Sequence, residues 1–291
     1  MIDKILWACD NSEDAGYALQ YAEYFAKSLN AEIVGLYVIP DYYEVPVLED
    51  FPTEELDLLA EWIKETESKE SDRLSGIADK ANEKGISFSS RISQGAPHSE
   101  IIKTAEEVKA DLIVIGKGRA DDKAILGATA LKILRRSPVP VLIAKKAEDE
   151  IGIKRLLVPT DIFNIDSRDL RFALDFSELS GAEIFSLNIV EIGDRKFPPE
   201  VVERLRGNAY SKLTQQINEA GMADKVTTVV NTAKNALLGI VDFIQEKNID
   251  LVVMNTYGGE KFRRTEFIGS VAERVVQESP CAVITVMPSE K

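Results

Sequence analysis

Short apolar runs alternate along this chain with segments whose apolar residues recur at helical spacing. The run at residues 112–115, Leu-Ile-Val-Ile, is apolar throughout, which is typical of a strand in a parallel sheet that helices cover on both faces. Just before it, Ile101, Ala105 and Val108 share one face of a predicted helix. The same alternation fills both halves of the chain. It predicts an α/β fold in which right-handed crossovers wind the strands into a doubly wound parallel sheet.

Four apolar blocks of the first half recur in the same order in the second half. The matched blocks are residues 4–10 with 155–161, 31–39 with 182–190, 111–116 with 250–255, and 137–143 with 279–285. Four matches in one order exceed what composition gives by chance, so we interpret the chain as a tandem duplication. The duplication predicts two five-stranded domains, residues 1–147 and 153–291, on either side of a short charged stretch. A length of 291 residues suits two domains of ordinary size.

The spacing of the matched blocks indicates where the two halves differ. The first blocks are offset by 155 − 4 = 151 residues and the third blocks by 250 − 111 = 139. The first half therefore has 151 − 139 = 12 additional residues, which we assign to a surface loop near residues 41–57. Tyr42, Tyr43, Phe51 and Trp62 lie in or beside this segment. They form either a site for a small hydrophobic ligand or an aromatic cover for a helix or a dimer contact.

The carboxyl ends of the first and fourth strands of each half are the expected ligand site. In a doubly wound sheet of order 3-2-1-4-5 these strands flank the point where the winding reverses, and ligands bind there. The first half has Asp10 and a glycine-bearing loop at 116–128 in these places, and the second has Asp161 and a loop at 255–270. A glycine-rich loop that leads into a helix N-terminus favours an anion such as phosphate. Glycines also serve ordinary strand-to-helix turns, however.

Asp10 and Asp161 each have two candidate roles. An Asp after an apolar strand commonly caps the next helix, and Asn11, Ser12 and Asn164 compete for that position. A carboxylate at a strand end also accepts hydrogen bonds from an adenine amino group or a ribose hydroxyl. Both halves have Asp here although the preceding strands differ, which favours a binding role in at least one half.

Composition and charge exclude several classes of partner. The chain is 45% hydrophobic and 29% charged, as in an ordinary globular protein. Its formal net charge of −14 repels phosphodiester backbones and anionic lipid surfaces. No apolar stretch approaches the roughly 18 residues of a membrane span, and Cys9 and Cys281 show neither a disulfide framework nor metal-ligand spacing. We therefore expect a cytoplasmic protein that binds neither nucleic acid nor membranes.

The absence of certain motifs argues against several enzyme classes. The chain has no G-x-x-x-x-G-K-[ST] sequence, and its one near-match to G-x-G-x-x-G, which starts at Gly116, lacks the third glycine and follows the fourth strand. P-loop NTPases and dinucleotide-dependent dehydrogenases are thus disfavoured. His98 is the only histidine, which excludes histidine-based metal clusters and a Ser-His-Asp triad in each half. The sequence identifies no catalytic residue and no metal ligand.

Several segments resemble the universal stress protein family. The resemblance is carried by residues 157–161, 187–191 and above all 269–286, which read LVPTD, LNIVE and GSVAERVVQESPCAVITV, and more loosely by residues 127–143. It implies two tandem α/β domains of sheet order 3-2-1-4-5, of the adenine-nucleotide alpha-hydrolase-like type. It also implies that the last strands, residues 139–144 and 282–286, pair with each other. One chain is then its own pseudo-dimer, with a homodimer as a further option.

One branch of this family binds ATP or AMP and is marked by G-x2-G-x9-G-[ST] after the fourth strand. In the second half, Gly259, nine intervening residues and Gly269-Ser270 match the latter part of this motif. When the match is made from the strand end, Asn255 takes the opening position and Gly258 comes second. The second half therefore departs from the motif at its first glycine.

The first half departs from the same motif at later positions. Gly116 matches the opening glycine, but Arg119 replaces the second glycine and Ala128 replaces the final Ser or Thr. The resemblance thus implies a better-kept nucleotide site in the second half. The implied ligand is ATP or AMP, with Mg²⁺ if the ligand is ATP.

The resemblance also implies binding residues, position by position. In the second half Asp161 would face adenine or ribose, the backbone of Ile189 would read the adenine edge, and the glycine loop would hold phosphates. The set there is Thr160, Asp161, Ile189, Asn255, Gly258, Gly259, Gly269, Ser270 and Val271. The weaker set of the first half is Cys9, Asp10, Val38, Gly116, Gly118, Gly127, Ala128 and Thr129.

Three functions follow as hypotheses. The leading one is a cytoplasmic stress-response protein that senses or stores an adenine nucleotide and hydrolyses it slowly or not at all. The alternative is a nucleotide-free scaffold whose loops serve folding and partner docking. An enzyme on this fold is the third, and it needs a fixed general base.

Overall fold

Strands and helices alternate through the computed structural model, which describes residues 2–41, 53–118, 126–147, 150–162, 168–256 and 268–287. The first half contains β1 (Lys4–Cys9), α1 (Glu13–Leu29), β2 (Glu32–Pro40), α2 (Thr53–Glu83), β3 (Phe88–Gly95), α3 (Pro97–Val108), β4 (Leu112–Ile115), α4 (Ala128–Arg136) and β5 (Val141–Ile143). The second half contains β6 (Arg155–Pro159), α5 (Arg168–Ser180), β7 (Glu183–Glu191), α6 (Pro199–Glu219), β8 (Val226–Ala233), α7 (Ala236–Lys247), β9 (Leu251–Asn255), α8 (Ser270–Glu278) and β10 (Ala282–Val286). Below, domain 1 and domain 2 denote the ranges 1–147 and 153–291 expected from the sequence.

The described strands form one sheet in the order β3-β2-β1-β4-β5-β10-β9-β6-β7-β8. Pairing is parallel within each domain, and each domain has the order 3-2-1-4-5. The strands β5 and β10 pair antiparallel across the middle, with Leu142 opposite Ile284. The predicted doubly wound α/β fold and its strand order are therefore confirmed, and the two last strands pair as the resemblance implies.

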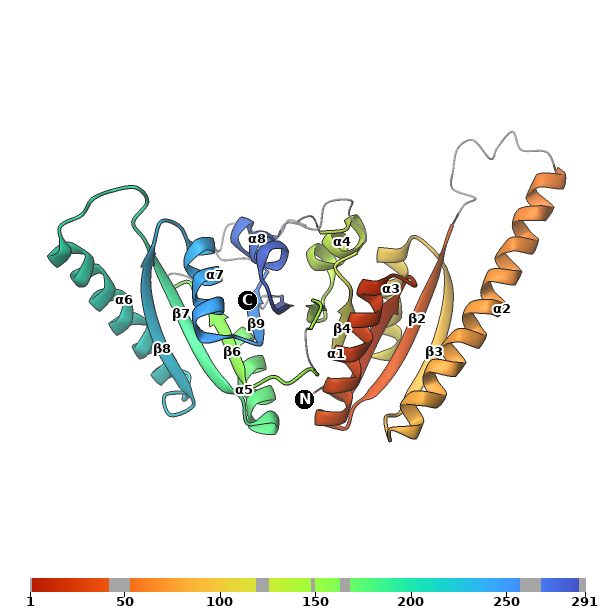
Figure 1. Ribbon diagram of the computed structural model, residues 1–291, viewed down its shortest axis with the longest axis horizontal. Coiled ribbons are helices and arrows are strands. Elements are labelled where there is room, and N and C mark those ends of the chain that lie inside the picture. Colours follow the sequence, from red (N-terminus) through yellow and green to blue (C-terminus); the bar gives the residue numbers. More distant parts are fainter. Residues whose placement is uncertain are drawn as a thin grey trace.

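Helices cover both faces of the sheet, because the strands are apolar on both sides. Buried residues of α1, α2, α5 and α6 pack in one cluster with one face of the strands. Buried residues of α3, α4, α7 and α8 pack in a second cluster with the other face. Figure 1 shows α2 and α6 at the two outer flanks of the molecule and α4 and α8 near its centre.

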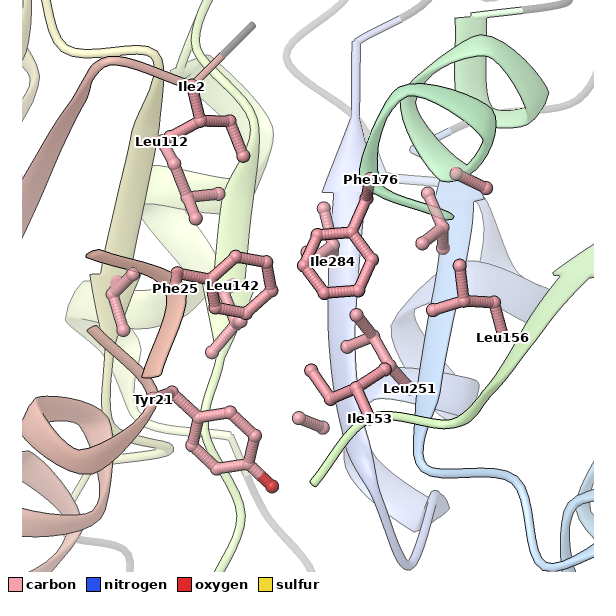
Figure 2. Close-up of a cluster of buried hydrophobic side chains, with 14 of the residues drawn as sticks. Ile2, Tyr21, Phe25, Leu112, Leu142, Ile153, Leu156, Phe176, Leu251 and Ile284 are labelled. Atoms are coloured by element: carbon pink, nitrogen blue, oxygen red, sulfur yellow. The ribbon is translucent and has the colours of Figure 1, made fainter. Parts of the chain in front are cut away.

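Aromatic side chains join the two domains on the first of these faces. The rings of Phe25 on α1 and Phe176 on α5 lie 4.9 Å apart between centroids. Figure 2 shows them facing each other beside Leu142 and Ile284 of the paired strands. The backbone N–H of Ile153 also donates to the hydroxyl of Tyr24 at 3.1 Å. The contact between domains is thus part of the hydrophobic core.

The segment expected to contain the additional residues of domain 1, near residues 41–57, lies mainly outside the described residues, which resume at Thr53 with α2. From Thr53 onward the chain is helical, and α2 has 31 residues where its counterpart α6 has 21. Leu56, Leu59 and Ile63 recur there at helical spacing. Trp62 lies on α2 with 44% of its surface exposed. The other three aromatic residues of the segment, Tyr42, Tyr43 and Phe51, lie outside the described residues.

Two sequence expectations concern membranes and cysteine chemistry. In the described ranges, no helix combines the length and the apolar character that a membrane span requires. Cys9 is buried and Cys281 is half-buried, and both thiols are free. The described residues also include no group of three or more His, Cys, Asp or Glu side chains placed to hold a metal ion.

Candidate functional site

A cavity of about 660 Å³ lies at the carboxyl ends of β6, β7 and β9 in domain 2. This is the edge of a doubly wound sheet where ligands bind, and the volume suits a small organic molecule. The lining residues are Pro159, Thr160, Asp161, Ile162, Asp169, Leu170, Leu187, Asn188, Ile189, Val190, Glu191, Leu205, Asn208, Ala209, Lys212, Ala236, Ile240, Met254, Asn255, Gly269, Ser270, Val271 and Ala272. Most of them are apolar, and the polar ones lie at strand ends, at helix starts and, for Asn208 and Lys212, along α6.

Residues expected from the sequence lie together around this cavity. The lining includes Thr160, Asp161, Ile189, Asn255, Gly269, Ser270 and Val271. The remaining two of that set, Gly258 and Gly259, lie outside the described residues. The structure thus brings positions that are up to 111 residues apart (271 − 160) to one place.

Hydrogen bonds hold the end of β6 in place. The hydroxyl groups of Thr160 and Ser186 are 2.9 Å apart, and the side-chain amide of Asn188 donates to the carbonyl of Thr160 at 2.8 Å. Ser186 and Asn188 are buried on β7. Since buried polar groups need partners, this network fixes the turn that presents the exposed Asp161 at the cavity.

The N-terminus of α8 forms another wall of the cavity. Gly269 is the N-cap and offers no side-chain acceptor to the first N–H groups of the helix. Its own N–H donates to the carbonyl of Thr256 at 2.7 Å, which closes the loop between β9 and α8. Such a helix start, with Ser270 at its first position, attracts an anion.

The same closure occurs in domain 1. There the N–H of Gly127 donates to the carbonyl of Lys117 at 3.0 Å, so Gly116, Lys117 and Gly127 correspond to Asn255, Thr256 and Gly269. At Gly116 a Cβ atom would lie 2.7 Å from backbone and side-chain atoms of Asp14. The opening glycine of domain 1 therefore allows a close approach between loop and helix.

Domain 2 has a polar pair at the corresponding place. The side-chain amide of Asn255 donates to Oδ2 of Asp169 at 3.0 Å, and the N–H of Leu170 donates to Oδ1 at 2.7 Å. Asp169 is only 5% exposed and lines the cavity. Both carboxylate oxygens of Asp169 therefore accept a hydrogen bond within the domain.

In domain 1 a partly buried ion pair covers the carboxyl end of β1. Glu70 of α2, 4% exposed, accepts from Arg73 Nε at 2.6 Å and from the side-chain amide of Asn11 at 2.7 Å. Arg73 also donates to the sulfur of Cys9 at 3.3 Å. Burial raises the pKa of the Cys9 thiol to about 11, although the nearby Arg73 opposes this rise. Cys9 is thus a protonated structural group at neutral pH.

The helix-cap alternative for Asp10 is settled by geometry. Ser12 is the N-cap of α1 and accepts from the N–H of Ala15 at 3.1 Å. Asp10 accepts from the N–H of Ser12 at 3.0 Å, which stabilises the turn before the helix. The remaining candidates of domain 1 occupy β2, the β4–α4 loop and the start of α4: Val38, Gly116, Gly118, Gly127, Ala128 and Thr129.

One pair of positions on the flanking helices distinguishes the domains. Glu70 and Arg73 on α2 cover the end of β1. At the end of β6, the corresponding residues of α6 are Ala209 and Lys212, which have the same spacing. Alanine leaves open the space that the carboxylate fills. The sequence reasoning missed these α6 residues and Asp169, although the buried positions Ala209, Leu213 and Ile217 recur at a helical spacing that marks the inward face of α6.

Comparison with known proteins identifies both halves. The model of the universal stress protein family matches residues 1–145 and 152–287. Universal stress protein MJ0531 of Methanocaldococcus jannaschii is 32% identical over 150 residues, which are 50% of this chain and 84% of that protein. Universal stress protein MJ0577 of the same organism is 30% identical over 164 residues, 50% of this chain and 96% of that protein.

A solved structure resembles the whole chain. The crystal structure of a universal stress protein from Archaeoglobus fulgidus superposes with a TM-score of 0.72 and 23% identity. The match covers 99% of this chain and 100% of that one. This likeness shows the fold of the entire chain.

Proposed function

The chain is a tandem member of the universal stress protein family, and we propose that its domain 2 binds an adenine nucleotide, ATP or AMP. The observation that supports this proposal best is the cavity at the strand ends of β6, β7 and β9, around which the expected binding residues gather. Domain 1, with Glu70 and Arg73 over the end of β1, is the weaker candidate. We expect one site per chain.

Each part of the cavity matches one part of the ligand. The apolar side chains of Leu187, Ile189 and Ile240 would pack against the adenine ring, and the backbone of Ile189 would bond its edge. Asp161 would accept hydrogen bonds from adenine or ribose. The first turn of α8, with Ser270, would receive the phosphate nearest the ribose.

Two further features shape the proposed chemistry. Mg²⁺ accompanying ATP would take its ligands mainly from phosphates and water, as is usual for this ion, because no cluster of protein ligands is present in the described ranges. We assign no residue of the described ranges as a general base for water. We therefore propose sensing or storage of the nucleotide, with slow hydrolysis or none.

A nucleotide-free scaffold is the second candidate function. The observation that favours it is the exposed apolar surface on the longer helix α2, where Leu58 is 65% and Trp62 is 44% exposed. On this view a partner protein or a second copy of the chain docks there, and the cavity has no ligand. We place the protein in the cytoplasm under both candidates, without nucleic acid or membrane partners.

Native mass spectrometry of the purified full chain tests the proposal. We expect one adenine nucleotide per chain. Equilibrium binding of AMP, ATP and cAMP then quantifies the site, cAMP being included because a universal stress protein has been solved in complex with it. No saturable binding below millimolar concentration would contradict the proposal and favour the scaffold.

Matched substitutions locate the site. Asp161→Ala and Ser270→Ala should each weaken nucleotide binding about tenfold, since each substitution removes a protein group that would hydrogen-bond the nucleotide. Asp10→Ala is the control, because Asp10 has the corresponding position in domain 1. Equal effects of Asp10→Ala and Asp161→Ala would show that the assignment to domain 2 is wrong.

A further inference from the structure

The Asn255–Asp169 pair is the part of the cavity that the proposed adenine site does not explain. Buried Ala18, Ala22 and Phe25 of α1 have the spacing of Asp169, Ala173 and Phe176 of α5, and the offset is 169 − 18 = 151 residues, as for β1 and β6. Domain 2 thus has Asp where domain 1 has Ala, and Asn where domain 1 has Gly116. Exchanging an alanine and a glycine for a buried carboxylate and an amide is costly unless the pair has a role.

The pair lies next to the place where phosphates would bind. Asn255 precedes Thr256, whose carbonyl accepts from the N–H of Gly269 at the start of α8. Asn255, Asp169 and Gly269 all line the cavity. A phosphate at the first turn of α8 would therefore share the cavity with Asn255 and with the buried carboxylate of Asp169.

The remaining charges of the cavity reinforce this effect. Its ionisable lining residues in the described part of the chain are Asp161, Asp169, Glu191 and Lys212. Three of these four residues are carboxylates. Each phosphate added to the ligand brings further negative charge near Asp169, and like charges in a partly desolvated site repel strongly.

We propose that the Asn255–Asp169 pair makes domain 2 selective for adenine ligands with a short phosphate chain, AMP over ATP. This inference rests on the proposed adenine site and specifies its ligand class. The amide of Asn255 limits the room beside α8, and Asp169 supplies the repulsion. A single phosphate still reaches the N–H groups of the first turn of α8.

Binding of AMP, ADP and ATP to the full chain, measured by calorimetry in EDTA, tests this selectivity. We expect AMP to bind at least tenfold more tightly than ATP, with ADP between them. Asp169→Asn keeps the size of the side chain and an acceptor for Asn255 but removes the charge. It should tighten ATP binding about tenfold and change AMP binding less than threefold. Asn255→Gly should shift the ratio in the same direction.

Asp175→Asn is the matched control, because Asp175 is exposed on the same helix and the substitution changes the net charge by the same amount. It should leave the AMP to ATP ratio unchanged, and thermal melting of each variant verifies folding. Three results would overturn the selectivity: wild-type ATP binding as tight as AMP binding, equal effects of Asp169→Asn on both ligands, or an equal shift with Asp175→Asn. Absence of binding by all three nucleotides would instead overturn the adenine site itself.

Discussion

Domains 1 and 2 differ most at the helix that flanks their strand ends. Both have the same strand order and the same glycine N–H bond that closes the loop before α4 or α8. In domain 1 the carboxyl end of β1 is covered by Glu70 and Arg73 of α2. In domain 2 the corresponding helix α6 contributes Ala209 and Lys212 to the wall of a cavity. A duplicated fold can therefore keep its strand order and its loop closure while the residues of one flanking helix at the strand ends differ.

The largest expected effect concerns the hydrophobic core between the two domains. It tests whether the two domains contribute equally to the stability of that core. Phe25 and Phe176 are both almost fully buried and contact each other, so Phe25→Ala and Phe176→Ala should each lower the free energy of unfolding by about 3–4 kcal/mol. Urea denaturation measures this. The double variant should lose less than the sum, because both substitutions remove the same contact.

Additive losses in that double variant would show that the rings do not depend on each other. Strongly unequal single losses would show that the two domains contribute differently to their shared core. With either result, the two domains would be alike in their backbone fold but not in how their side chains stabilise the shared core.

A glutamate on α6 that fills the cavity of domain 2 should cover the end of β6, as Glu70 of α2 covers the end of β1 in domain 1. Ala209→Glu places on α6 the residue that α2 has at position 70, and should weaken AMP binding at least a hundredfold, about 2.7 kcal/mol, because the side chain occupies the ligand volume. Calorimetry measures the loss. Tyr210→Glu is the control, since Tyr210 is 49% exposed on the same helix.

Retained AMP binding in Ala209→Glu would place the ligand elsewhere, provided that thermal melting shows a folded protein. A similar loss with Tyr210→Glu would attribute the effect to the added charge on α6. The difference between the two variants is therefore the informative quantity.

Opening domain 1 is the converse change. Glu70→Ala leaves Arg73 without its buried carboxylate partner and should lower the free energy of unfolding by about 2 kcal/mol, somewhat less than a fully buried pair, because Arg73 is 32% exposed. Glu203→Ala, which breaks the exposed pair with Arg206 on α6, should cost about 0.5 kcal/mol or less. Equal losses in urea denaturation would show that the Glu70–Arg73 pair behaves as a surface pair.

The sequence predicts the shared features of the domains better than their differences. Apolar runs that recur in the same order in both halves identify the strands, the family resemblance implies their order in the sheet, and the carboxyl ends of β6 and β9 direct attention to Asp161 and Asn255. Glu70 and Ala209 escape this reasoning because their role depends on how each helix is rotated against the sheet, which is set by tertiary packing. Asp169 looks like a first-turn acid, which usually faces solvent. Its burial depends on the partner Asn255, which is 86 residues away.

The smallest expected effect concerns an asymmetry at the far end of α8. Lys117 and Lys145 of domain 1 both donate to the carbonyl of Gln277, at 3.3 and 3.1 Å, whereas the corresponding residues of domain 2 are Thr256 and Met287. Burial, and then the charge of Lys117, lowers the pKa of Lys145 to about 8, from an ordinary value of 10.5. Between these values the unfolded chain binds more protons than the folded one, so the contribution of Lys145 to stability increases as the pH rises.

Lys145→Met should abolish this contribution. The difference in free energy of unfolding between wild type and variant should change in favour of the wild type from pH 8 to pH 9, by less than about 1.4 kcal/mol. Burial raises the pKa values of Cys9 and Cys281 to about 11, which lowers stability above about pH 9. This loss is the same in both proteins for Cys9, whereas the charge of Lys145 acts on Cys281, so the comparison is confined to pH 8 to 9. Lys146→Met is the control, because Lys146 is exposed. Parallel pH curves for wild type and Lys145→Met would mean that the ammonium group at the end of α8 is solvated, and the contact between domain 1 and α8 would then be electrostatically neutral.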